Sequence, residues 1–137
     1  LLRASSYYYA PETWVAYRQR EGSILSTMTL PKAFDQSAAW LALRQALEGR
    51  AELGHHGLQF ALAHQCARNL LGAMRFVRQA SAPDATEPEL AAAAVRIRAD
   101  FAAASPLAAE ALQQAYWRRG WWLRWLKFRK GYAYRSA

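Results

Sequence analysis

The sequence has only one cysteine, few β-branched aliphatic residues and no long apolar run. The single cysteine, Cys66, excludes a disulfide within the chain and fits a reducing compartment such as the cytoplasm. No apolar segment reaches the ~18 residues that a membrane-spanning helix needs, since Arg96 and Arg98 interrupt the longest alanine-rich stretch. The first residues, LLRASSYYYA, lack the apolar run and cleavage site of a secretory signal. We therefore predict a cytoplasmic protein without a membrane span.

Residue patterns that would indicate catalysis or a bound metal are also missing. The acidic residues are scattered singly, without the clustering that two-metal phosphodiester chemistry requires. The chain has neither a nucleophile-elbow sequence nor a glycine-rich phosphate loop. His55, His56, His64 and Cys66 are close in sequence, but the His-x-Cys spacing directs two side chains to different faces of a helix. The sequence therefore predicts no enzyme, no metal site and no cofactor.

The scarcity of Val and Ile beside abundant alanine favours an all-α fold. A chain of 137 residues is long enough for one domain with a single core. A hydrophobic content of 53% is far above that of disordered chains. We predict one helical domain over residues 1–137, a bundle of about five helices in an up-and-down or orthogonal arrangement.

Proline, glycine and capping residues mark where the helices begin and end. Residues 1–11 are expected to be flexible and 81–88 to form a linker. The expected helices cover about 12–21, 31–49 or as far as 54, 58–80, 87–105 and 106–130. Thr29 and Thr86 are the expected caps of the second and fourth, and Ser105 that of the last. Gly120 is a weak point inside the last helix, since glycine costs ~1 kcal/mol relative to alanine there.

The C-terminal segment 116–135 carries nearly all of the net charge and contains no acidic residue. The chain has 18 Lys and Arg against 10 Asp and Glu, a net charge of +8, and seven of the 18 lie in this segment. Six Trp, Tyr and Phe residues of the segment lie between Tyr116 and Tyr134, interleaved with the cations. Arginine pairs bidentately with phosphate and indole rings stack on bases, so this combination is typical of a nucleic-acid-binding surface.

A continuous last helix would place Trp117, Trp121, Trp125 and Phe128 on one arc. An aromatic row at this spacing predicts a buried face, which leaves the basic side chains and Trp122 on the remaining surface. The candidate nucleic-acid contacts of this segment are Arg118, Arg119, Trp122, Arg124, Lys127, Arg129 and Lys130.

A second basic row lies on the predicted helix 58–80. Arg68, Arg75 and Arg78 fall within about 80° of one another on a helical wheel, together with His64. Two interpretations stay open for this row. Its arginines form a phosphate-binding track beside the C-terminal segment, or they pair with acidic residues of other helices.

A small, basic, all-helical chain with arginine rows on two helices resembles the small helical subunits of CRISPR effector complexes. The resemblance covers the whole chain and rests on size, helicity and charge. It implies several copies that line an antiviral defence complex and bind nucleic acid through its backbone. The residues it implies are Arg68, Arg75, Arg78, Arg118, Arg124 and Arg129.

The sequence thus predicts a non-catalytic, nucleic-acid-binding subunit of a larger nucleoprotein assembly. It would contact the phosphate backbone of RNA or single-stranded DNA without sequence specificity. Protein subunits, including further copies of the chain, are expected partners, because 13% aromatic residues exceed what one small core hides. Two alternatives stay open: a membrane-surface protein whose Trp- and Arg-rich last helix lies in the interface, and a structural protein–protein interaction module.

Overall fold

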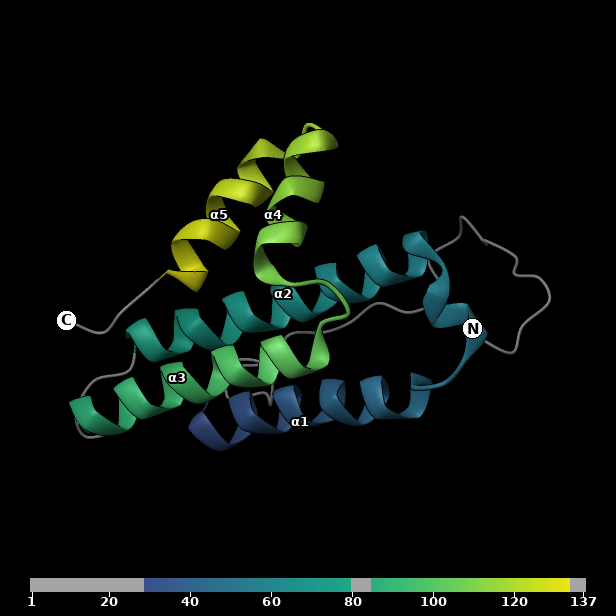
Figure 1. Cartoon of the computed structure of the whole chain (residues 1–137). Coiled ribbons are helices and arrows are strands. Elements are labelled where there is room, and N and C mark those ends of the chain that lie inside the picture. Colours follow the sequence, from purple (N-terminus) through teal and green to yellow (C-terminus); the bar gives the residue numbers. More distant parts are fainter. Residues whose placement is uncertain (1–28, 80–84, 134–137) are drawn as a thin grey trace, which may run out of the picture.

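The structure is a computed structural model that describes residues 29–79 and 85–133 (Figure 1). This part of the chain is 85% helical and contains no strand. The predicted all-α class, with about five helices, is confirmed. The elements are α1 (Leu30–Leu47), a short 3-10 helix η1 (Ala51–Gly54), α2 (His56–Gln79), α3 (Glu87–Ala104), α4 (Ala109–Arg118) and α5 (Trp122–Tyr132).

The helices are arranged as a three-helix bundle and a helical hairpin. Helices α1, α2 and α3 each pack against the other two, and the hairpin of α4 and α5 stands on α2 (Figure 1). Helix α2 contacts each of the other four helices, so it is the central element of the described fold. Gly131 lets the last turn of α5 lie against α2, because a Cβ at this position would overlap the side chain of Leu71.

The starts of α1 and α3 follow from their capping residues. The Thr29 hydroxyl accepts a hydrogen bond from the Lys32 N–H at 3.5 Å, as an N-cap side chain does. The Glu89 carboxylate accepts from the Thr86 N–H at 2.8 Å, and this bond is the main reason that its pKa lies below the usual value. Both caps agree with the sequence prediction.

Alanine dominates the core between α1, α2 and α3. Seven alanines of these helices are buried, and small side chains let helix axes approach closely. Larger buried side chains fill the space between them, including Leu70 and Met74 of α2 and Ile97 and Phe101 of α3. A second buried group, formed by Leu112, Tyr116 and Phe128, joins the hairpin to this core.

The prediction of one helix over 106–130 was wrong, because α4 ends at Arg118. Gly120 has a left-handed backbone with φ of 68°. Its N–H donates to the Trp117 carbonyl at 3.0 Å, and the Trp121 N–H donates to the Tyr116 carbonyl at 2.9 Å. These two bonds form a Schellman motif, which ends a helix at glycine. Gly120 is therefore a helix terminator rather than a weak point inside a helix.

The predicted start of that helix at Pro106 was also wrong, because α4 begins at Ala109. The Ser105 hydroxyl donates to the Leu107 carbonyl at 2.6 Å and closes a local turn instead of capping the helix. Other predictions fall where the structure describes nothing: the helix over 12–21, the flexible segment 1–11, and residues 81–84 of the linker. Residues 87 and 88 of the predicted linker belong to α3.

Candidate nucleic-acid interface

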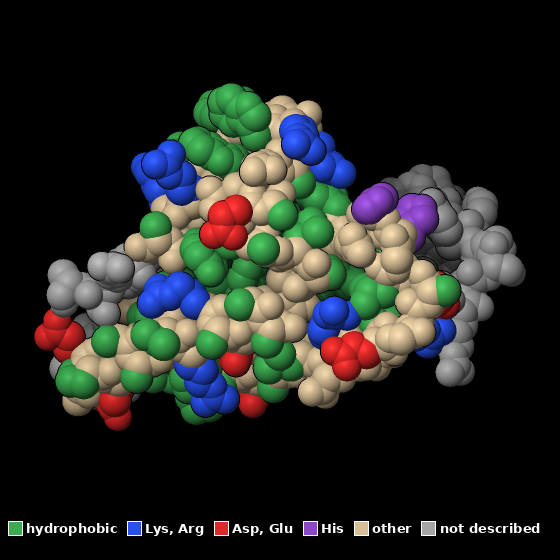
Figure 2. Space-filling model, in the orientation of Figure 1, with side chains coloured by type: hydrophobic (Ala, Val, Ile, Leu, Met, Phe, Trp, Pro, Cys, Tyr) green, Lys and Arg blue, Asp and Glu red, His purple; other side chains and the backbone are tan. Residues whose placement is uncertain are grey.

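The described helices divide into a charge-balanced part and a strongly basic part. Helices α1 and α3 together carry four Lys and Arg and four Asp and Glu. Helices α2, α4 and α5, with the turn between α4 and α5, carry nine Lys and Arg and one acidic residue, Glu110. Figure 2 shows basic and hydrophobic side chains gathered over the hairpin at the top of the molecule. The hairpin and α2 therefore form the surface that attracts anions.

A cavity of about 320 Å³ lies where α2 meets α4 and α5, and we call it the basic groove. Its lining residues are His64, Ala67, Arg68, Leu71, Tyr116, Leu123, Arg124 and Lys127. Three predicted contacts, Arg68, Arg124 and Lys127, are brought together here from the two separate basic rows. The volume is at the lower end of the range for small-ligand sites, ~300–1,000 Å³.

His64 is one of the residues that line the basic groove, and its side chain is neutral at neutral pH because its pKa is lowered. Its Nδ1 lies 2.9 Å from the Tyr116 hydroxyl, and its Nε2 lies 3.3 Å from Nη1 of Arg124. Arginine only donates hydrogen bonds, so Nε2 is the acceptor and the proton sits on Nδ1. Burial lowers the pKa of His64, and the charges of Arg124 and Arg68 lower it further. The imidazole therefore positions Arg124 instead of adding a charge to the basic row.

The guanidinium of Arg124 is fixed on one side and available on the other. Besides its bond to His64, it lies 5.3 Å from the centroid of the Trp121 ring, within the range of a cation–π contact. Within the described residues, Arg68, Arg75, Arg124 and Lys127 form no ion pair with an acidic side chain. For Arg68 and Arg75, this is evidence against pairing with acids across the described bundle. The positive charge of the basic groove is thus not balanced by any acidic side chain that the structure describes.

Other predicted contacts are engaged with the protein or lie elsewhere. Arg78 donates to the Lys130 carbonyl at 3.5 Å and so ties α2 to the end of α5. Arg119 stacks over the Phe60 ring at 3.7 Å, and Arg129 lies 5.3 Å from the Trp125 ring. Arg75, Arg118, Lys130 and Trp122 are exposed outside the basic groove. Arg135, the last of the seven cations in the segment 116–135, lies outside the described residues.

The prediction of a buried row of Trp117, Trp121, Trp125 and Phe128 was wrong for its first two members. Trp117 is 63% exposed and Trp121 39%, whereas Phe128 is fully buried. The row assumed a continuous helix, and the break at Gly120 gives α4 and α5 separate buried faces. Trp122, predicted to be exposed, is 58% exposed.

Sequence reasoning missed Tyr116 as a site residue. Ala109, Leu112 and Tyr116 are the buried residues of α4 and follow a spacing of three and four. That spacing is visible in the sequence once Gly120 is taken as the end of a helix. Burial raises the pKa of Tyr116 to about 12, so its hydroxyl stays protonated at neutral pH.

A second cavity, of about 470 Å³, lies on the outer side of the hairpin, and we call it the Trp117 pocket. Its lining residues are Glu110, Gln113, Gln114, Trp117, Arg118 and Trp125. The rings of Trp117 and Trp125 meet edge to face, with centroids 5.5 Å apart. The pocket contains one predicted contact, Arg118, and two glutamines that the sequence did not single out.

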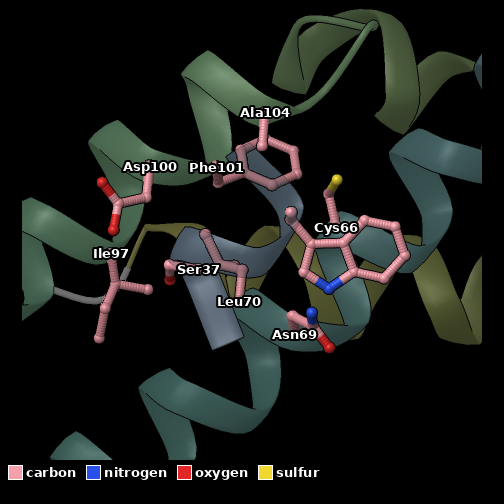
Figure 3. Close-up of a pocket in the computed structure, with 9 residues that line it drawn as sticks. Ser37, Cys66, Asn69, Leu70, Ile97, Asp100, Phe101 and Ala104 are labelled. Carbon is pink, nitrogen blue, oxygen red and sulfur yellow. The ribbon is translucent and has the colours of Figure 1, made fainter. Parts of the chain in front are cut away.

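A third cavity lies between α1, α2 and α3 and has about the volume of one water molecule, 10 Å³ (Figure 3). Ser37, Cys66, Asn69 and Asp100 supply its polar side chains. Burial raises the pKa of the Cys66 thiol to about 11, so it is protonated and unreactive at neutral pH. This cavity has no room for a substrate.

The described residues contain neither a candidate metal site nor a helix that could span a membrane. No group of three His, Cys, Asp or Glu side chains in this part of the chain is arranged to hold a metal ion. None of the described helices has both the length and the hydropathy required to cross a membrane. Comparison with known proteins does not identify a function, because no family model, curated protein or solved structure matches the chain. The candidate interface therefore rests on its geometry and charge.

Proposed function

We propose that the chain binds the phosphate backbone of RNA or single-stranded DNA as a non-catalytic subunit of a larger assembly. The observation that carries this proposal is the basic groove. Arg68, Arg124 and Lys127 line one cavity, and no acidic residue among those that the structure describes lines it with them. Guanidinium groups held in place before binding lose little freedom when they pair with a phosphate.

The distribution of charge favours a chain of phosphates over a single small anion. The groove holds three of the nine cations on α2 and the hairpin. The other cations lie on the same elements, which suits a strand that brings several phosphates to this part of the surface. A single phosphate would leave most of this charge unused. Counterion release from such a strand supplies affinity without reading the sequence.

The side chains of the basic groove support contact with the backbone instead of base edges. Its charged groups are donors, which suit phosphate oxygens. Its acceptor His64 Nε2 is occupied by Arg124. Exposed indoles on the hairpin support a preference for single strands, whose bases are free to stack.

Membership of an assembly is supported by apolar side chains that the described core does not use. Trp122 is 58% exposed, Leu123 54% and, on α3, Val95 62%. Exposed apolar groups of this kind are commonly covered by partner proteins. Size, helicity and two basic rows also suit the small helical subunit of a CRISPR-type effector complex in the cytoplasm, which we propose as the assembly.

A matched pair of double variants tests the proposal. Arg68→Gln with Arg124→Gln removes two charges from the groove, and Arg50→Gln with Arg96→Gln removes two from elsewhere. Binding of a labelled single-stranded oligonucleotide is measured by fluorescence anisotropy at one salt concentration. We expect the groove pair to lower affinity at least tenfold and the control pair less than twofold. Equal losses of affinity in the two double variants would mean that only net charge matters. No binding by the wild type would contradict the proposal.

A second candidate function is binding to an anionic membrane surface, which one specific observation favours. Trp121, Trp122 and Leu123 are consecutive exposed residues at the start of α5, beside Arg124. Indoles and cations together suit the lipid interface. Co-sedimentation with anionic and neutral vesicles separates the two functions. Binding only to anionic vesicles, with a blue shift of Trp emission and no oligonucleotide binding, would select the membrane.

A further inference from the structure

We propose that the Trp117 pocket holds one unstacked base of the bound single strand. This inference rests on the proposed function, because the strand is brought to the hairpin by its phosphates. It adds a second site on the other side of α5, with a different chemistry from that of the basic groove. The pocket is larger than the groove, about 470 Å³, and its surface is mostly apolar.

The aromatic floor of the Trp117 pocket suits a flat ligand. Trp117 is 63% exposed although it is one of the largest apolar side chains of the fold. The edge-to-face contact with Trp125 holds its ring in place, and Arg129 lies over the Trp125 ring at 5.3 Å. A ring that is fixed by one neighbour and still open to solvent is ready to stack with a base.

The polar side chains of the pocket match the edge of a base and its phosphate. The amides of Gln113 and Gln114 each offer a donor and an acceptor, and Glu110 offers acceptors. Such groups bind the edges of unpaired bases, which carry both donors and acceptors. Arg118 adds a positive charge at the same pocket for the phosphate of that nucleotide.

Other occupants leave part of this pocket without a partner. An apolar peptide side chain would cover the two glutamine amides and the Glu110 carboxylate without bonding to them, at a cost in desolvation. A cationic side chain suits Trp117 and Glu110, but it would enter a surface with nine cations and one acid. A free inorganic anion suits Arg118 alone. A nucleotide uses the rings, the amides and the cation together.

The experiment compares two oligonucleotides with the same length and the same number of phosphates. One is oligo(dA), and the other has abasic sites in place of every base. Stacking on an aromatic side chain contributes enough for about a tenfold preference for oligo(dA). We expect Trp117→Ala to remove this preference, keep the affinity for the abasic strand and leave Tm nearly unchanged, since Trp117 is mostly exposed. Trp117→Phe should restore part of the preference.

Val95→Ala is the control, because Val95 is an apolar side chain of α3 that is 62% exposed and lines neither the Trp117 pocket nor the basic groove. We expect this variant to keep the preference for oligo(dA). The inference is overturned if Trp117→Ala keeps the preference, if Val95→Ala also removes it, or if the wild type binds both strands equally. Equal binding of both strands leaves the proposed function standing. Binding of neither strand overturns the proposed function as well.

Discussion

Nδ1 of His64 lies 2.9 Å from the hydroxyl of Tyr116, and this hydrogen bond joins α2 to α4 across 52 positions of sequence. The other nitrogen of the same ring accepts from Arg124 of α5. One neutral imidazole thus connects the central helix to both helices of the hairpin. The docking of the hairpin and the position of a groove cation depend on the same side chain.

Removing the Tyr116 hydroxyl should weaken the docking of the hairpin. Tyr116→Phe keeps the buried ring and deletes one hydrogen bond, so we expect a loss of about 1 kcal/mol in the free energy of unfolding. Urea denaturation measures this loss. Tyr132→Phe is the control, since the Tyr132 hydroxyl bonds to no described residue. Equal losses in the two variants would mean that the bond to His64 contributes nothing.

The neutral state of His64 should make stability depend on pH. Its folded pKa is lowered by burial, then by Arg124 and Arg68, whereas the unfolded value is ~6.5. The unfolded chain therefore takes up a proton first as the pH falls. The stability that the neutral ring provides is present above about pH 6.5 and is lost as the pH falls from there towards the folded pKa.

His64→Gln tests this pH dependence, because glutamine does not titrate and can still bond to Tyr116. We expect the fall in Tm between pH 7.5 and 5.5 to be smaller in the variant than in the wild type. Glu52 and Glu89 have pKa values below 4.5 in the folded protein, so their titration lies below this window. The same fall in both proteins would exclude His64 as the cause.

Binding of a single strand should weaken steeply as salt is added. If about five phosphates are neutralised, the logarithm of the association constant falls with the logarithm of salt concentration at a slope of about −3 to −4. Fluorescence anisotropy over a series of salt concentrations gives the slope. The double variant Arg68→Gln with Arg124→Gln should have a shallower slope by about 1.4. A slope near zero in the wild type would remove the electrostatic argument.

The first three described helices were predicted closely because their boundaries depend on local signals. Thr29, Pro31 and Thr86 fix helix starts through bonds and backbone angles within a few residues. The basic groove depends on tertiary contacts, since Arg68 and Arg124 meet only when α5 packs against α2. Spacing along one helix identifies the members of each basic row but not the cavity between them.

Two aromatic residues of the hairpin, which the sequence placed on one helix face, should differ in how much they contribute to stability, because one is buried and the other is exposed. Phe128 is fully buried, so Phe128→Ala should lower the free energy of unfolding by about 3–5 kcal/mol. Trp117 is 63% exposed, so Trp117→Ala should cost far less. Chemical denaturation of both variants checks the difference. Similar losses would support the continuous aromatic row that the structure contradicts.

The break at Gly120 gives a prediction in which the sign of the effect decides between two structures. In a continuous helix, Gly120→Ala would raise the free energy of unfolding by about 1 kcal/mol, because alanine favours helix. In the Schellman motif, the φ of 68° forces alanine into the left-handed region, at a cost of about 1–2 kcal/mol.

Gly72→Ala in α2 is the control for the direction in which a glycine-to-alanine change shifts the free energy of unfolding. Gly72 lies inside a helix, and nothing lies within 4 Å of an added Cβ. This variant should be more stable than the wild type by about 0.5–1 kcal/mol. We therefore expect opposite shifts of Tm: upward for Gly72→Ala and downward for Gly120→Ala. If both variants gained stability, α4 and α5 would be one helix. The Trp117 pocket, which needs the hairpin to place Trp125 against Trp117, would then not form.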